Sequence, residues 1–211
     1  MAKYDNLSEA CVKEAFRIIE SDGIENLSLR AVARKLGVSH QAPYKHFESR
    51  DHILAEVVRQ AFDRFAKYLE QNPLTDDPYA DMRQLGESYL RYALENPAHY
   101  RLMFMTVLPS ANKHPGMMRS AQRPFHLLTA CIERVWQMHG IEPNPKAIQL
   151  DGLFIWSQMH GIASMHQTAV MDTLEMSQDV LNTLIDHTMF RLSLAIGHQV
   201  PLPDYLSSVS E

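Results

Sequence analysis

The chain has 211 residues, of which 45% are hydrophobic and 21% are charged, an ordinary balance for a globular protein. This composition argues against a disordered or fibrous chain, and no apolar run approaches the ~18 residues that a membrane-spanning helix needs. The two cysteines, Cys11 and Cys131, are too few for a disulfide framework or a four-cysteine zinc site. We therefore expect a cytoplasmic protein with no metal, no cofactor and no membrane partner.

The net charge of −5 conceals a cationic stretch. Residues 28–50 carry one acid, Glu48, against the bases Arg30, Arg34, Lys35, Lys45 and Arg50. A local positive stretch is what contact with a phosphate backbone requires, because neutralised phosphates release counterions. A solvated helix face would have the same composition, so charge alone leaves both interpretations open.

The N-terminal part of the chain predicts short helices. Apolar residues recur at three- and four-residue spacing after Asn6, which is a good N-cap, and Gly23 lies where this first helix would end. Ser28 and Ser39 can cap two further short helices. Gly37, between them, can take the positive φ that a tight turn needs.

The rest of the chain predicts longer helices. Proline follows a good capping residue at Asp77-Pro78, Asn96-Pro97 and Asn144-Pro145, which is typical of a helix start. The stretch 106–116 is predicted to be a loop, and Pro124 predicts a kink or a later start in the helix that contains it. Alternation typical of strands is missing. Long helices are predicted over 50–70, 116–140, 145–169 and 177–198, so the fold class is all-α, with a head at 1–50 and a larger body at 51–211.

Residues 28–50 have the spacing of a helix-turn-helix. Apolar residues of its first helix would pack on the preceding helix, and a second helix at 39–46 would enter the major groove of DNA. Gln41 on that second helix can contact adenine in a bidentate manner. An αα-hairpin with an ordinary polar face would show the same spacing, which therefore does not decide between them.

A wider set of residues resembles the N-terminal domain of the tetracycline-repressor (TetR) family of bacterial regulators. The resemblance runs from Ala10 to Val57 and includes Leu36-Gly37-Val38-Ser39 and Tyr44-Lys45-His46-Phe47. It implies a three-helix DNA-binding head and a larger helical body that binds ligand and dimerises. Pro43 departs from the commoner small or aliphatic residue and removes one backbone donor. Carried over by position, the DNA contacts would be Ser28, Arg30, Ser39, His40, Gln41, Tyr44, Lys45, His46 and Arg50.

In the body, Trp156, His160 and Gly161 look like the Trp…His-Gly signature of one subgroup of TetR-like C-terminal domains. Trp156 and His160 are four residues apart and share one face of a helix. The functional interpretation places them in a ligand cavity with the imidazole as its polar group, and the alternative is a buried structural pair. Under the functional interpretation, the ligand-binding residues would be Met103, Phe104, Phe125, Leu128, Trp156, Met159 and His160.

The last two long helices carry a broad apolar stripe. In the TetR family such helices pair with their copies in a four-helix bundle, so we expect a homodimer through 145–169 and 177–198. A stripe of this width could also be buried within one chain. A two-fold dimer fits a palindromic DNA site, which requires two heads about one turn (~34–36 Å) apart.

With the resemblance, the sequence predicts a ligand-responsive transcriptional regulator that binds a palindromic operator in double-stranded DNA as a homodimer and acts as a repressor. An unidentified small apolar or amphipathic ligand would release or modulate it. The chain has eleven histidines but no His-Glu-x-x-His, no Gly-x-Ser-x-Gly and no phosphate-binding glycine loop, so we do not expect an enzyme. A helical binding protein, or an enzyme whose head serves another partner, is the weaker hypothesis.

Overall fold

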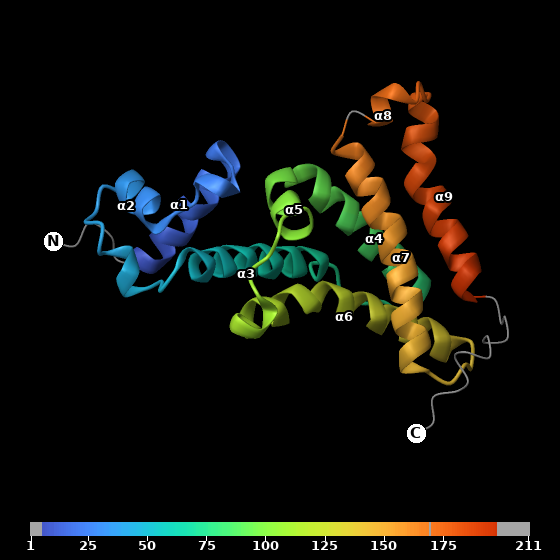
Figure 1. Ribbon diagram of the computed structural model, residues 1–211. Helices are drawn as coiled ribbons and strands as arrows, with labels where there is room; N and C mark the ends of the chain where they lie inside the picture. The colour runs from blue at the N-terminus through green and yellow to red at the C-terminus, as the bar shows by residue number, and fades with distance from the viewer. Residues whose placement is uncertain (1–5, 169, 198–211) are drawn as a thin grey trace. The chain divides into compact units, whose positions relative to one another are not determined.

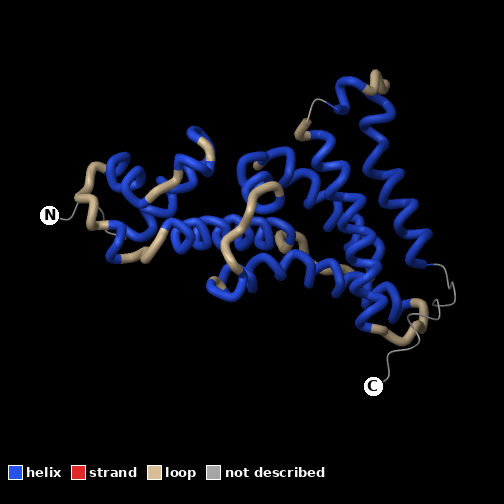
Figure 2. The backbone as a smooth tube through the Cα atoms, in the orientation of Figure 1, coloured by secondary structure: helices blue, strands red, loops and turns tan. Residues whose placement is uncertain are grey.

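The computed structural model describes residues 6–168 and 170–197 (Figure 1). Within these ranges the regular structure is entirely helical, with no strand, which confirms the all-α prediction (Figure 2). The chain divides into two compact units. The first comprises residues up to Ala66 together with Ala98–Arg123, and the second comprises Lys67–Pro97 together with residues from Pro124 onward. The expected boundary at residue 50, between a head and a body, stays a prediction.

The first unit contains the helix-turn-helix. Its helices are α1 (Leu7–Asp22), α2 (Leu29–Leu36), most of α3 (Arg50–Leu69), α5 (Pro97–Phe104) and the start of α6 (Pro115–Met138). α1 begins where the side chain of Asn6 accepts a hydrogen bond from the Glu9 N–H at 3.1 Å. It ends at Gly23, which has a φ of 92°. Both ends confirm the prediction.

α2 and the turn after it also agree with the prediction. The Ser28 hydroxyl oxygen accepts a hydrogen bond from the Ala31 N–H at 3.1 Å and caps the helix. Gly37 adopts the left-handed conformation, with φ 64° and ψ 39°, and its N–H bonds to carbonyls of the last helical turn. Residues with a Cβ are strained in that conformation, so the turn requires glycine.

The prediction of a regular second helix over residues 39–46 is wrong. The chain forms turns at residues 40–42 and a single 3₁₀ turn at Pro43–Lys45. In an α-helix the residue at position 43 would donate its N–H to the Ser39 carbonyl, but proline has no N–H. The Ser39 carbonyl instead accepts from the Ala42 N–H at 3.0 Å, an i+3 bond that gives the tighter 3₁₀ geometry.

Aromatic side chains pack α5 within the first unit. Phe104 of α5 meets Phe62 and Phe65 of α3 edge-on, with ring centroids 5.6 and 6.1 Å apart. His99, also on α5, stacks on Phe16 of α1, with centroids 4.1 Å and planes 21° apart. Burial, and to a lesser extent the charge of Arg64, lowers the pKa of His99 to about 4, so its ring packs as a neutral aromatic.

The second unit is built from α4 (Pro78–Glu95), the C-terminal part of α6, α7 (Pro145–His166), α8 (Val170–Thr173) and α9 (Gln178–Gly197). Asp77 and Asn144 cap α4 and α7 through hydrogen bonds from main-chain N–H groups, as predicted. α6 continues through Pro124, so the later start considered for that helix is wrong. The predicted helices otherwise agree within a few residues, although positions 169 and 198 at their ends lie outside the described residues.

Three helices of the second unit, α4, α7 and α9, pack against one another (Figure 1). Gly86 of α4 lies next to side chains of both other helices. A Cβ at this position would be 2.8 Å from the Met189 Sδ of α9 and 3.5 Å from the Met159 Cε of α7. The absence of a side chain at Gly86 therefore permits this packing.

Candidate DNA-binding surface and ligand pocket

Seven of the nine predicted DNA contacts are exposed, and together they are the candidate DNA-binding surface of the first unit. Two buried residues of the segment, Pro43 and Phe47, fix it to the core of the unit. The predicted contacts between and around them are exposed, and four of these line a shallow depression. The exposed members are Arg30, Ser39, His40, Gln41, Tyr44, Lys45 and His46, and those that line the depression are Arg30, His40, Gln41 and Tyr44.

The hydrogen-bonding groups of this surface are not used inside the chain. Among the described residues, the side chains of Arg30, Gln41 and Lys45 have no hydrogen-bond or ion-pair partner. A guanidinium and an ammonium are suited to phosphates, which fix the register of a protein on DNA. An amide is suited to a base edge, which carries the sequence information.

Two of the predicted DNA contacts have structural roles. The Ser28 hydroxyl caps α2. Arg50, at the start of α3, donates from Nε to the Leu27 carbonyl at 3.1 Å and from Nη2 to the Ile24 carbonyl at 2.7 Å. Its Nη1 lies 3.6 Å from the Asp51 carboxylate. Arg50 therefore joins the loop before α2 to the start of α3, a role that no local sequence pattern could reveal.

In the second unit, Trp156 and His160 of α7 meet the hydroxyl of Tyr89 on α4. The Trp156 indole N–H donates to the Tyr89 hydroxyl oxygen at 3.2 Å, and that oxygen is 3.3 Å from His160 Nδ1. Because Tyr89 accepts from the indole, its own O–H can donate to Nδ1 of a neutral imidazole. Burial lowers the pKa of His160, which favours the neutral form. Sequence reasoning missed Tyr89, which no motif marks.

The other predicted ligand residues are distributed between the two units. Phe125 of α6 lies beside Trp156, with ring centroids 6.3 Å apart. Met159 is buried against α4, and Leu128 of α6 is half-buried. Met103 and Phe104 belong to the first unit, where Met103 is buried in the core. Within the second unit, the structure thus brings together Phe125, Trp156 and His160.

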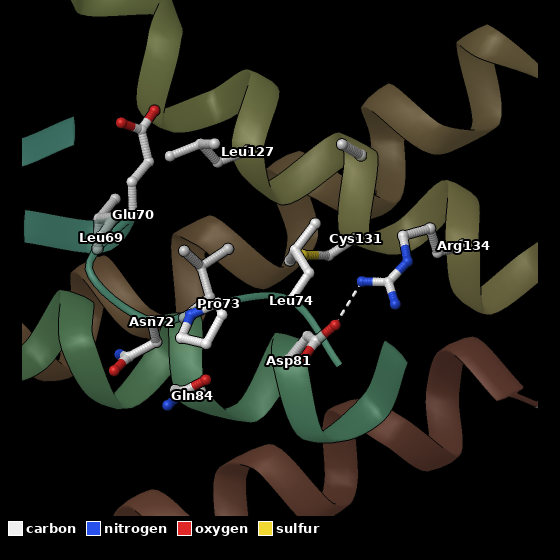
Figure 3. A pocket seen from close by; sticks show the side chains of 12 residues that line it. Leu69, Glu70, Asn72, Pro73, Leu74, Asp81, Gln84, Leu127, Cys131 and Arg134 are labelled. Carbon is white, nitrogen blue, oxygen red and sulfur yellow. Dashed lines mark hydrogen bonds and ion pairs between the residues drawn. The ribbon is translucent and has the colours of Figure 1, made fainter. Parts of the chain in front are cut away.

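A pocket of about 200 Å³ opens elsewhere in the second unit, between the loop that precedes α4, α4 itself and α6 (Figure 3). None of the predicted ligand residues lines it. Its walls are mainly apolar, and Asp81 and Arg134 form a polar end, with side chains directed toward each other in Figure 3. The lining residues are Leu69, Glu70, Asn72, Pro73, Leu74, Asp81, Gln84, Leu85, Leu127, Ala130, Cys131 and Arg134.

The polar end of the pocket is held by a cluster of three residues. The Asp81 carboxylate forms an ion pair with Arg134 and accepts hydrogen bonds from the Thr75 N–H at 3.0 Å and the Thr75 hydroxyl at 2.8 Å. Arg134 also donates to the Thr75 carbonyl. Burial alone would raise the pKa of the Asp81 carboxyl, but these hydrogen bonds outweigh it and hold the pKa below its usual range. Asp81 is therefore a carboxylate.

Two further properties follow from the described residues. No group of three or more His, Cys, Asp or Glu side chains among them could hold a metal ion. Their helices are all too short or too polar to cross a membrane.

The all-helical fold, the turn at Gly37 and the exposed surface with Arg30 and Lys45 place this chain in the class of helix-turn-helix proteins. Residues 12–57 match the sequence model described as bacterial regulatory proteins, tetR family. Residues 82–189 match the one described as tetracyclin repressor-like, C-terminal domain. The chain belongs to the TetR family, whose proteins are regulators rather than enzymes, in agreement with the prediction.

An individual curated relative resembles the chain over a smaller part of its length than the two family models do together. The HTH-type transcriptional regulator Mb1846 of Mycobacterium bovis is 28% identical over 96 residues, which are 44% of this chain and 41% of that protein. The chain thus matches less than half the length of this curated relative.

Solved structures cover more of the chain. A protein with unknown function from Rhodococcus sp. RHA1 has a TM-score of 0.71 at 22% identity, over 93% of this chain and 96% of that one. The TetR family transcriptional regulator PfmR from Thermus thermophilus has a TM-score of 0.61 at 20% identity, over 90% of this chain and 98% of that one. At these identities the likeness shows the fold.

Proposed function

We propose that this protein is a ligand-responsive transcriptional regulator, a repressor that binds a palindromic DNA operator as a homodimer. The observation that carries the proposal is the exposed surface around Arg30, Gln41 and Tyr44, where polar and cationic groups converge on a depression while Pro43 and Phe47 anchor the segment below. A surface of this kind on a helix-turn-helix is suited to the major groove. A regulator acts where the DNA lies, so we assign it to the cytoplasm.

The roles of the side chains follow from their chemistry. His40, Gln41 and Tyr44 would contact base edges, because they follow the turn at Gly37 and offer hydrogen bonds. Arg30, Ser39, Lys45, His46 and the Ser28 hydroxyl would contact phosphates. For Arg50 we propose a positioning role, because its guanidinium is bonded to the loop before α2.

Dimerisation through α7 and α9 is supported by the apolar residues that these helices leave exposed. One face of α7 packs in the core, and the opposite face exposes large apolar side chains around Gly161, where a Cβ would meet no atom within 4 Å. On α9, Phe190 is 59% exposed. We propose that the exposed apolar side chains of α7 and α9 form one surface, because contiguous apolar patches are typical of an interface. These side chains are Leu150, Leu153, Phe154 and Met165 on α7, and Val180, Phe190 and Leu194 on α9.

The response to ligand is assigned to the second unit. Its two candidate regions are the group of Phe125, Trp156 and His160, and the pocket beside Asp81 and Arg134. A small apolar or amphipathic ligand would release the repressor if it bound the free protein more tightly than the DNA-bound protein. The ratio of those two affinities limits how far DNA binding can weaken.

The test is selection of binders from a randomised pool of duplex DNA, followed by a salt titration on the sequence recovered. We expect a palindrome and a steep loss of affinity with salt. Tyr44→Ala and Lys45→Ala should weaken binding. Lys67→Ala, which removes the same charge from an exposed position of α3 in the second unit, should have little effect. Equal affinities for Lys45→Ala and Lys67→Ala, or failure to recover any preferred sequence, would overturn the proposal.

A further inference from the structure

The pocket in the second unit has apolar walls supplied by two stretches of the chain that are distant from each other in the sequence. Residues 69–85 comprise the end of α3, the loop after it and α4, and residues 127–134 belong to α6 (Figure 3). Cys131 belongs to the apolar wall, because it is buried and burial raises the pKa of its thiol, which therefore stays neutral. The main apolar contributors are Leu69, Pro73, Leu74, Leu85, Leu127 and Ala130.

The volume limits the size of the ligand. Single-ring hydrocarbons fill apolar cavities of about 150 Å³, so a pocket of about 200 Å³ has room for one ring with a short substituent. Larger amphiphiles would have to leave most of their surface in water.

The polar end selects against charge. The Asp81 side chain is only 2% exposed and is paired with Arg134, so these two charges balance each other at the polar end. Glu70, the third charged residue of the lining, lies apart from this pair in Figure 3 and has an interaction of its own within the chain. An anionic ligand that approached Arg134 would meet the Asp81 carboxylate, and a cationic one would meet the guanidinium. Removing either ligand charge from water would therefore bring little compensation.

Arg134 can still donate a hydrogen bond. A guanidinium has five N–H groups, and the bonds of Arg134 to Asp81 and Thr75 within the described residues leave some of them unused. The Arg134 side chain is 28% exposed, so these groups can be reached. A neutral acceptor such as a carbonyl oxygen could pair with them without disturbing the ion pair.

We infer that this pocket binds an uncharged compound with a single ring and one hydrogen-bond acceptor, whose ring lies against the leucines and whose acceptor faces Arg134. Leu74, which is 70% exposed at the mouth, loses water-exposed surface when the ring is bound. The role of this compound as the effector rests on the proposed regulatory function. Its binding to the pocket does not.

The experiment titrates the full chain, without DNA, against acetophenone as the probe. Binding is monitored through the NMR signals of the ligand. Three analogues of similar size serve as comparisons: ethylbenzene lacks the acceptor, benzoate is anionic and benzylamine is cationic. We expect acetophenone to bind about tenfold more tightly than ethylbenzene, because ethylbenzene cannot accept a hydrogen bond from the charged Arg134 guanidinium. Both charged analogues should bind more weakly still.

A variant that fills the pocket locates the binding. Ala130→Phe places a large side chain at an exposed position of the lining and should abolish acetophenone binding without disturbing the core. Gln137→Phe makes the same change at an exposed position of α6 that is not part of the lining, and it should bind like the native chain. Equal binding by the two variants, or tighter binding of benzoate or benzylamine, would overturn the inference.

The regulatory role is then read separately, as the affinity for the recovered DNA sequence with and without acetophenone. Weaker DNA binding that persists in Gln137→Phe and disappears in Ala130→Phe supports the effector role. Acetophenone binding without any DNA binding would leave the pocket assignment intact and overturn the regulator.

Discussion

Arg50 donates a hydrogen bond from Nη2 to the Ile24 carbonyl, 2.7 Å away and 26 residues earlier in the chain. A second bond, from Nε to the Leu27 carbonyl, fixes the orientation of the same guanidinium. The start of α3 is thereby bonded to the loop that leads into α2. Ser28, which caps α2, follows Leu27 directly in the chain.

Replacing Arg50 tests this role. We expect Arg50→Ala to lower the free energy of unfolding by about 1–3 kcal/mol, because two carbonyls lose a charged donor. Arg50→Lys should recover little, since an ammonium cannot supply the planar pair of donors. The measurement is urea unfolding, monitored by circular dichroism. Full stability of Arg50→Ala would mean that the bonds contribute nothing, and a loss confined to DNA affinity would point to a phosphate contact instead.

The turn at Gly37 gives a second prediction. Gly37→Ala introduces a Cβ into a left-handed residue and should cost about 1–2 kcal/mol of stability. Gly140→Ala is a matched control, because Gly140 also has positive φ, 68°, and space for a Cβ, but lies in the second unit.

Both variants should unfold at lower urea concentration. Only Gly37→Ala should also weaken DNA binding, because only that turn sets the direction of residues 39–46. If the two variants lose DNA affinity equally, the turn has no special role in recognition.

The Tyr89 hydroxyl is predicted to stabilise the second unit. Tyr89→Phe removes the acceptor of the Trp156 indole N–H and a partner of His160 Nδ1, so we expect a loss of about 1–3 kcal/mol in urea unfolding. Trp156 fluorescence should also change. Tyr68→Phe removes a hydroxyl bonded to Glu95 at an exposed site and should cost less than about 1 kcal/mol. Similar losses in both variants would show that the Tyr89 hydroxyl stabilises the unit no more than an exposed hydroxyl does.

His99 makes stability depend on pH. Its pKa is lowered from 6.5 to about 4 in the folded chain, so between these values the unfolded chain binds more protons. The contribution of neutral His99 to the free energy of unfolding is therefore fully present above pH 6.5 and is lost as the pH falls toward 4.

Comparison with His99→Phe isolates this residue, because phenylalanine keeps the ring on Phe16 and does not titrate. The urea midpoint of the native chain should fall more steeply than that of the variant between pH 6.5 and 4. Parallel curves would show that His99 is protonated without cost in the folded chain.

Local sequence signals predicted the helix ends well and the tertiary contacts poorly. Asn6, Ser28 and Gly37 act within four residues of their own positions, so their patterns are readable. The missing backbone donor at Pro43 is also readable from the sequence, but the 3₁₀ turn that it produces at residues 43–45 was not predicted.

The candidate site shows the same division. The exposure of Gln41, Tyr44 and Lys45 agrees with the DNA contacts that the resemblance implies. The partners of Arg50 and Trp156 could not be predicted, because those bonds span 23 to 67 residues and depend on packing that no spacing encodes. The pocket beside Asp81 and Arg134 is likewise formed by two stretches of the chain that are distant in the sequence.

The segment around Pro43 contains two kinds of side chain. Pro43 and Phe47 are buried and hold the segment on the core, whereas most of the side chains between and around them are exposed. The exposed ones, among them His40, Gln41 and Tyr44, contribute little to the core. They can therefore be exchanged at small cost in stability, while the single turn keeps any replacement in the same place. If these side chains contact bases as proposed, very few substitutions would redirect the chain to a new DNA target, and the segment would be a compact starting point for engineering altered DNA specificity.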